Sequence, residues 1–181
     1  MTRVALVTGG TRGIGEAIST SLQDSGHTVV ANYAGNDDNA NAFSERTGIQ
    51  VCKFDVGDFD AVKSQIGKLQ EEHGAIEILV NNAGITRDGT MHKMQAEQWI
   101  DVIRTNLGSC FYVSRCVIEG MRERKFGRIV NIGSIKRLQC GALKFERSSQ
   151  RYATGLAQMN SALFHGLYYK CRLAQEWRPP K

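Results

Sequence analysis

The glycine-rich stretch Thr8-Gly9-Gly10-Thr11-Arg12-Gly13-Ile14-Gly15 constrains the fold of this chain more than any other feature. It follows an apolar run at residues 4–7, typical of a buried strand, and precedes apolar residues at helical spacing. In such a unit the N–H groups at the start of the helix face an anion, and glycine lets the anion approach the backbone closely. The stretch therefore predicts a phosphate-binding turn. A turn that only joins a strand to a helix is the alternative.

The rest of the pattern alternates strands with helices. Strands are expected at 4–8, 28–32, 50–54, 76–80 and 127–132, with helices ending near residues 25, 47, 74 and 124. A long final helix from about Ala96 to Arg124 is expected to present Trp99, Ile103, Leu107, Phe111 and the residues from Val113 to Val117 on its apolar face. Alternation of this kind predicts an α/β, Rossmann-like, doubly wound parallel sheet whose ligands bind at the carboxyl ends of the strands.

Charge is distributed unevenly along the chain. Residues 1–135 contain 14 Lys and Arg against 16 Asp and Glu, whereas residues 136–181 contain 9 against 2, so the whole excess of +5 comes from the last segment. We expect a nucleotide-binding Rossmann domain at 1–135 and an atypical basic tail at 136–181, irregular or helical, that is not an independent domain. The tail contains no recognisable nucleic-acid-binding module, so no nucleic-acid partner is expected.

Several compartments and site types are disfavoured by the sequence. No apolar run is long enough to span a membrane, and no basic region followed by an apolar region marks a secretory signal. The five cysteines form no Cys-x-x-Cys pair, which disfavours a disulfide framework or a zinc site. A cytoplasmic protein without a membrane partner or a bound metal is expected.

Four motifs resemble those of the short-chain dehydrogenases/reductases. They are the glycine turn at 8–15, Asn81-Asn82-Ala83-Gly84, Asn106, and Ser134 after residues 131–133. The resemblance covers residues 2–135, and two spaced motifs of this kind together are strong evidence for the family. Segments such as Gly84-Ile85-Thr86-Arg87-Asp88 are most similar in sequence to the NADPH-dependent acetoacetyl-CoA reductases of polyhydroxybutyrate biosynthesis. The 3-oxoacyl-acyl-carrier-protein reductases have much the same sequence in these segments.

The resemblance implies a role for each matching position. Ser134 would donate a hydrogen bond to the substrate carbonyl, where negative charge develops. Asn106 would organise a proton-relay water, and Asp88 would lie at the substrate. The residues expected at the cofactor are Gly9, Arg12, Gly13, Ile14 and Gly15 at the pyrophosphate and adenosine end, Asp55 and Val56 at the adenine, and Asn82, Ala83 and Gly84 at the adenosine ribose.

The charge near the end of the second strand favours NADP as the cofactor. NAD enzymes place an acid there that binds the ribose 2′-OH and would repel a 2′-phosphate. Here the strand ends Asn32-Tyr33-Ala34 without an acid, and Arg12 puts a cation in the glycine turn. Asp37 and Asp38 are the contrary observation, and we interpret them, together with Asn36, as helix caps.

The resemblance breaks after Ser134. The family's general acid is a Tyr followed four residues later by a Lys, and the usual interval from Ser134 leads instead to Arg147 and Arg151. A guanidinium stays protonated and cannot replace a phenol. No Tyr-x-x-x-Lys occurs in the 181 residues, and the sheet is expected to be truncated after the fifth strand. A shifted reading frame and a genuinely diverged tail both remain open as explanations.

The resemblance implies an oxidoreductase that uses NADPH to reduce a short 3-oxoacyl thioester, acetoacetyl-CoA to 3-hydroxybutyryl-CoA. Its activity is expected to be impaired, because the Tyr and Lys of the family motif are missing. A 3-oxoacyl-acyl-carrier-protein reductase of fatty-acid synthesis and a non-catalytic nucleotide-binding remnant are the alternatives. The resemblance implies a homotetramer, which a chain truncated in this way is not expected to form.

Overall fold

The computed structural model describes residues 2–87 and 89–133. All five expected strands are present, and their ends differ from the expected ones by at most one residue. They are β1 (Val4–Val7), β2 (Thr28–Tyr33), β3 (Gln50–Lys53), β4 (Ile76–Asn81) and β5 (Arg128–Asn131). The helices are α1 (Gly13–Asp24), α2 (Asp37–Thr47), α3 (Phe59–His73), α4 (Ala96–Ile103) and α5 (Ser109–Glu123), with a 3-10 turn, η1, at Met91–Lys93 and a π-helical segment, η2, at Arg104–Gly108.

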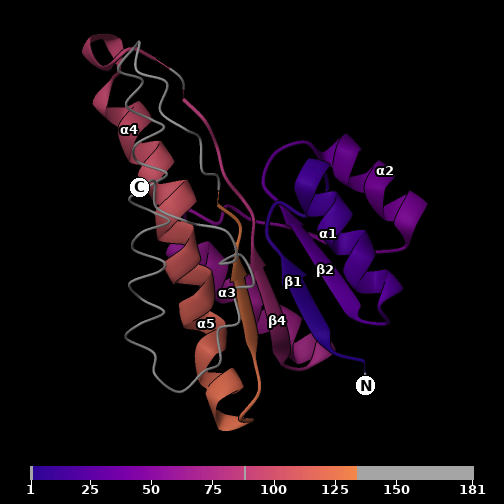
Figure 1. Cartoon of the computed structure of the whole chain (residues 1–181). Helices are drawn as coiled ribbons and strands as arrows, with labels where there is room; N and C mark the ends of the chain where they lie inside the picture. The colour runs from indigo at the N-terminus through magenta and orange to yellow at the C-terminus, as the bar shows by residue number, and fades with distance from the viewer. Residues whose placement is uncertain (1, 88, 134–181) are drawn as a thin grey trace, which may run out of the picture.

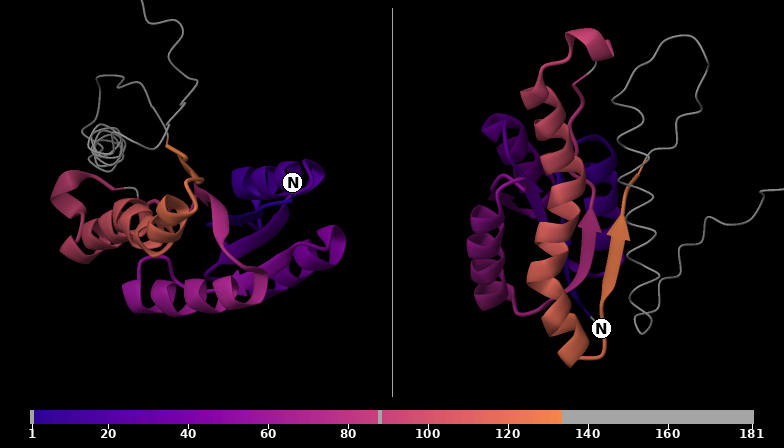
Figure 2. Two further views of the ribbon diagram at one scale, coloured as in Figure 1. Left: turned by 90° about the horizontal axis from the view of Figure 1, so that it is seen from below. Right: turned by 90° about the vertical axis from the view of Figure 1, so that its left-hand side faces the viewer.

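The strands form one parallel sheet in the order β3-β2-β1-β4-β5. The order reverses at β1, since the chain moves outward to β3 and then crosses to the other side of β1 to form β4 and β5. Helices lie on both faces, with α1 and α2 on one and α3 and α5 on the other (Figures 1 and 2). The predicted Rossmann-like α/β fold is confirmed, with a crevice expected where the strand order reverses.

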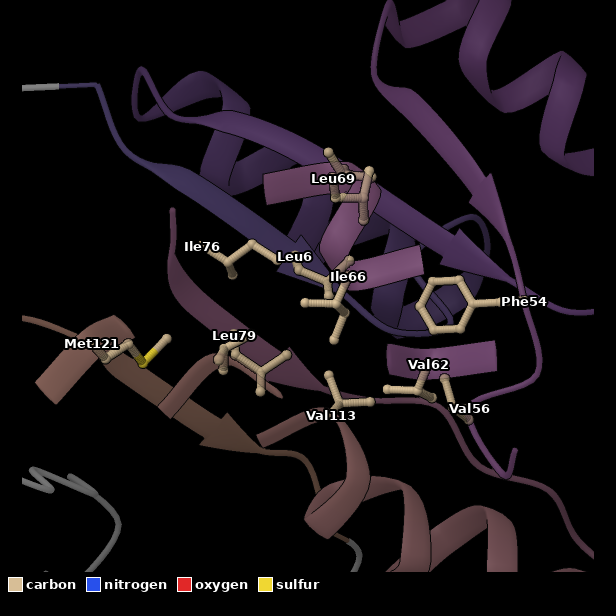
Figure 3. Close-up of a cluster of buried hydrophobic side chains, with 12 residues drawn as sticks. Leu6, Phe54, Val56, Val62, Ile66, Leu69, Ile76, Leu79, Val113 and Met121 are labelled. Carbon is tan, nitrogen blue, oxygen red and sulfur yellow. The ribbon is translucent and has the colours of Figure 1, made fainter. Parts of the chain in front are cut away.

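Each face of the sheet has its own hydrophobic core, because successive side chains of a strand point to opposite faces. Leu6 of β1 points into the core shared with α3 and α5 (Figure 3), and its neighbours Ala5 and Val7 point into the core under α1 and α2. The two clusters are fully buried along the central strands. Such burial on both faces explains why the strands are continuously apolar in the sequence.

Asparagine and aspartate side chains start two of the helices. Asn36 caps α2 by accepting a hydrogen bond from the backbone N–H of Asn39 at 2.9 Å, and Asp58 caps α3 through the N–H groups of residues 60 and 61. The interpretation of Asp37 and Asp38 as caps is wrong, because both lie in the first turn of α2. There they still interact favourably with the helix dipole.

The long final helix is interrupted, and this corrects one part of the expected apolar face, Phe111, whereas the expected burial of Val113 and Val117 is confirmed. The π-helical segment η2 inserts extra backbone between α4 and α5, which changes the phase of the helix surface. As a result Phe111 is 61% exposed, whereas Val113, Val117 and Met121 are buried against the sheet and α3. Residues 136–181, including the predicted tail helix, lie outside the described residues.

Within the described residues, no helix combines the length and the apolar character needed to cross a membrane. In the same part of the chain, His, Cys, Asp and Glu side chains are nowhere gathered in a group of three or more that would hold a metal ion. Cys52, Cys110 and Cys116 are free thiols. Burial raises the pKa of the Cys52 thiol to about 12, so it stays protonated at neutral pH.

Candidate functional site

A cavity of about 710 Å³ opens at the carboxyl ends of β1, β2, β3 and β4. Its walls come from residues at and just after the strand ends. They are residues 9, 11, 12, 14 and 15 after β1, 32–36 at the end of β2, Asp55 and Val56 after β3, and residues 82–85 with Arg87 after β4. Asp101, Arg104 and Thr105 close it from the side of α4 and η2. The cavity therefore lies at the reversal of strand order, where a doubly wound sheet binds its ligand.

The glycine turn needs its glycines for two different reasons. Gly9 and Gly13 have φ of +62° and +54°, a left-handed conformation that side chains disfavour. Gly15 has no room, because a Cβ there would clash with the Gly9 carbonyl oxygen and would lie 2.6 Å from the Asn82 amide nitrogen. The start of α1 at Gly13 is thus packed tightly against the turn, and its N-terminus lies at the cavity.

Thr8 and Asn82 lock the glycine turn to the end of β4. The Thr8 hydroxyl oxygen accepts hydrogen bonds from the backbone N–H groups of Asn82 and Ala83, both at 3.0 Å. In return, the Asn82 side-chain amide donates to the carbonyl oxygens of Thr8 and Gly9, at 3.0 and 3.1 Å. The two predicted motifs are therefore one interlocked unit in the structure.

Asn32 links the same turn to the other half of the sheet. Its buried side-chain amide donates to the Phe54 carbonyl oxygen at 2.9 Å, and its side-chain oxygen accepts from the Gly9 N–H at 3.4 Å. A side chain at the end of β2 thereby holds together the turns after β1 and β3. The sequence pattern predicts Asn32 at a strand end but does not indicate this role.

In the turn after β3, one carboxylate, that of Asp55, contacts both a backbone N–H group and a charged side chain. Asp55 accepts a hydrogen bond from the Gly57 N–H at 2.8 Å, and its other oxygen lies 3.9 Å from the Arg104 guanidinium. Arg104 also pairs with Asp101 at 3.5 Å. This cluster brings η2 to the side of the cavity where the resemblance places the adenine.

Asn106 lies in the π-helical segment and clamps the chain that follows β4. Its side-chain oxygen accepts from the Ile85 N–H at 2.8 Å, and its amide donates to the Ile85 carbonyl oxygen at 2.9 Å. The Asn106 backbone carbonyl accepts a long bond, 3.5 Å, from the Cys110 thiol. Asn106 does not line the cavity itself but fixes the segment that does.

At the β2 end, the cavity is lined by Tyr33, by residues 34–36, which precede α2, and by Asn39 in the first turn of that helix. Tyr33 sits beside Lys53, its register partner on β3. Lys53 donates to the Asp37 carboxylate at 2.8 Å. This bond and the neighbouring Tyr33 hydroxyl lower the pKa of Asp37, and the bond raises the pKa of Lys53.

The predicted cofactor residues converge on this cavity. Gly13 is the exception, since it starts α1 but does not line the wall. Asp88 and Ser134 lie outside the described residues. The residues that line it are Gly9, Arg12, Ile14, Gly15, Asp55, Val56, Asn82, Ala83 and Gly84.

Tyr33, Arg87 and Arg104 also line the cavity, although the sequence motifs did not single them out. Tyr33 had a usable signal, because it directly follows the expected second strand and so belongs at the same rim. Arg87 follows the Asn-Ala-Gly motif closely enough to suggest the same. Arg104 had none, because its position depends on the π-helical segment.

Comparison with known proteins places the chain among well-defined relatives. Residues 3–145 match the model of the short chain dehydrogenase family. The chain is 58% identical to the acetoacetyl-CoA reductase of Paracoccus denitrificans over 135 residues, which are 75% of this chain and 56% of the relative. It is 41% identical to the 3-oxoacyl-acyl-carrier-protein reductase of Escherichia coli (strain K12) over 135 residues, 74% of this chain and 55% of the relative.

Two matches extend further along the chain. The acetoacetyl-CoA reductase of Shinella zoogloeoides is 47% identical over 176 residues, covering 97% of this chain and 68% of the relative, so this match continues beyond residue 135. The crystal structure of a serine dehydrogenase from Escherichia coli superposes with a TM-score of 0.78 and 29% identity, covering 90% of this chain and 77% of the other. The chain spans only about half the length of most of the curated relatives it matches.

Proposed function

The chain belongs to the short-chain dehydrogenase family, and we propose on this basis that it binds NADP(H) in the cavity at the carboxyl ends of its strands. We propose further that its reaction is the reduction of a short 3-oxoacyl thioester, at a rate limited by the absence of Tyr-x-x-x-Lys. The observation that carries the proposal is the interlocked unit of the glycine turn and residues 82–84. This unit holds a helix N-terminus open to the cavity.

The described residues fit a dinucleotide. The volume of about 710 Å³ lies within the usual range for small-molecule sites. Gly15 leaves no space for a side chain at the start of α1, which is what a pyrophosphate approaching the backbone requires. Residues 82–84 and Asp55 with Val56 stand on either side of the turn, where the ribose and the adenine would be held.

Charge at the β2 end supports NADP over NAD. The lining residues there, from Asn32 to Asn36 together with Asn39, include no acid. Arg12, at the N-cap of α1, is exposed and lines the same cavity. A cation and neutral amides favour a 2′-phosphate, whereas an NAD site offers the ribose diol a carboxylate.

Bound NADPH supplies the hydride, and the chain supplies orientation. We propose that Ser134 donates a hydrogen bond to the substrate carbonyl and that Asn106, by clamping Ile85, positions the strand end nearby. Proton donation has no matching residue in the sequence, because neither Arg147 nor Arg151 can replace a phenol. General acid catalysis contributes roughly 10² to 10⁴ in rate, so slow turnover is expected.

The substrate proposal rests on the relatives. Three of them, at 58%, 54% and 47% identity, are named acetoacetyl-CoA reductases. We therefore propose acetoacetyl-CoA as substrate, 3-hydroxybutyryl-CoA as product and polyhydroxybutyrate biosynthesis as the setting, with Asp88 at the substrate. The 3-oxoacyl-acyl-carrier-protein reductases, at 41%, make the carrier-protein thioester the second candidate.

Two measurements on the full chain test the proposal. Fluorescence titration with NADPH is expected to show saturable binding, and NADPH oxidation with acetoacetyl-CoA is expected to be slow but faster than with the carrier-protein thioester. Absence of nucleotide binding would overturn the proposed function. Oxidation at an ordinary enzymatic rate would overturn the proposed impairment, and binding with no turnover at all would support a nucleotide-binding remnant instead.

A further inference from the structure

An acidic residue stands close to the position where NADP enzymes avoid one. Asp37 is the first residue of α2 and follows Asn36, which lines the cavity. In dinucleotide-binding folds, an acid near the end of the second strand bonds the ribose 2′-OH and excludes a 2′-phosphate. Asp37 is therefore close to the position where an acid would exclude the 2′-phosphate of the cofactor proposed above.

The structure gives this carboxylate other partners. Lys53 donates to Asp37 at 2.8 Å, and the neighbouring Tyr33 hydroxyl also lowers the pKa of this carboxylate. Tyr33 and Lys53 are register partners on neighbouring parallel strands, so their side chains lie on the same face of the sheet. Lys53 and Tyr33 both belong to strands, and Asp37 is not among the residues that line the cavity.

We propose that Lys53, which lies outside the cavity, is a positioning residue for cofactor choice: it holds the Asp37 carboxylate against β3 and so leaves the ribose end open to a 2′-phosphate. The inference rests on the proposed function. In this inference, Lys53 acts through Asp37 and does not touch the nucleotide itself. The Lys53 ammonium also neutralises the Asp37 carboxylate, so this charge of the first turn of α2 does not repel a 2′-phosphate.

A structural role for the same ion pair is separable from this one. Both side chains are about half exposed, at 50% and 55%, and exposed pairs contribute little to folding stability. Loss of Lys53 should therefore leave the unfolding temperature nearly unchanged. The ratio of the affinities for NADPH and NADH is the quantity that a purely structural role would not move.

The other charged groups near the start of α2 are accounted for. Asp38 is exposed on the same turn, and Arg46 at the far end of α2 pairs with Glu16 at 2.8 Å. Asp38 has no part in the bond with Lys53, so it provides a matched acidic control. Lys68, exposed on α3, provides a matched lysine control.

The test is the dissociation constants of NADPH and NADH, measured by fluorescence titration on the full chain. Competition by 2′,5′-ADP and 5′-AMP isolates the effect of the 2′-phosphate. K53M is expected to lower the NADPH-to-NADH affinity ratio by about tenfold, because it frees a charge near the phosphate. K53R should keep the wild-type ratio, D37N/K53M should return to within about threefold of it, and D38N/K53M should stay low. K68M should change nothing.

The outcomes separate the two claims. A wild-type chain that binds neither nucleotide, or that prefers NADH, overturns the proposed cofactor and this inference together. A wild-type chain that prefers NADPH while K53M has the same ratio overturns the inference alone. Equal weakening of both nucleotides in K53M, accompanied by a lower unfolding temperature, assigns Lys53 a structural role and also overturns the inference.

Discussion

The glycine-turn junction and the carboxyl end of β5 lie on the same edge of the sheet but are built differently. At the junction, Thr8 and Asn82 exchange four hydrogen bonds with neighbouring backbone, and Gly15 has no space for a methyl group. At the end of β5, Val130 and Ile132 are 46% and 40% exposed. The glycine-turn side of the cavity is therefore fixed by mutually dependent backbone contacts, whereas the β5 side is tied to the described residues mainly by its strand pairing.

Gly15→Ala is expected to have the largest effect. The new Cβ would clash with the Gly9 carbonyl oxygen, which cannot move without shifting the turn. We expect the free energy of unfolding to fall by about 3 kcal/mol and NADPH binding to be lost, as measured by urea denaturation and titration.

Gly67→Ala is the matched control for this change. Gly67 is inside α3, and outside the helix backbone nothing lies within 4 Å of the place a Cβ would take, so alanine should stabilise the protein by about 0.5 to 1 kcal/mol. If Gly15→Ala behaved like Gly67→Ala, the tight junction would not exist.

Thr8→Val should follow in magnitude. Valine keeps the shape but removes the oxygen that accepts from the N–H groups of Asn82 and Ala83. Two amides lose their partner, and a loss of about 2 kcal/mol in the free energy of unfolding is expected. Thr28→Val, at an exposed strand position, should change the unfolding midpoint little. Equal midpoints for the two variants would contradict the interlocked unit.

Asn106→Ala should have an intermediate effect. It removes both bonds to Ile85, at 2.8 and 2.9 Å, and releases the segment after β4 from η2. We expect a loss of about 1 to 1.5 kcal/mol in chemical denaturation, together with weaker NADPH binding. Asn41→Ala, exposed on α2, is the control. Unaltered stability in Asn106→Ala would show that the clamp is dispensable.

Asn131→Ala is expected to have the smallest effect, because it probes the β5 end. Asn131 is exposed, and its side-chain oxygen accepts one bond, at 2.8 Å, from Asn81, which also bonds Ser114. A change below about 0.5 kcal/mol and an unaltered NADPH affinity are expected. A loss as large as that of Thr8→Val would remove the contrast between the two regions.

The strands were predictable because burial on both faces leaves a continuous apolar signal, as in Thr28 to Asn32, with glycine or asparagine marking the ends. The π-helical segment was not predictable. Apolar spacing from Trp99 through Phe111 to Val117 fits an uninterrupted helix. Val113 and Val117 face the core as expected, and only tertiary packing shows that Phe111 faces outward.

The candidate site was predictable where a motif carries its own backbone geometry. The glycine turn and residues 82–84 met as expected, since carboxyl ends of parallel strands share one edge. The bond between Lys53 and Asp37 was not predictable, because it depends on the register of β2 with β3. The interpretation of Asp37 as a cap followed from residue preference alone, and the Asn36 side chain took that position.

Backbone hydrogen–deuterium exchange of the full chain, with and without NADPH, distinguishes the fixed junction from the β5 end in one experiment. We predict slower exchange on NADPH addition in residues 9–16 and 82–85, with little change in β5. Unchanged exchange in the glycine turn at saturating NADPH, or protection confined to other segments, would contradict the proposed nucleotide site.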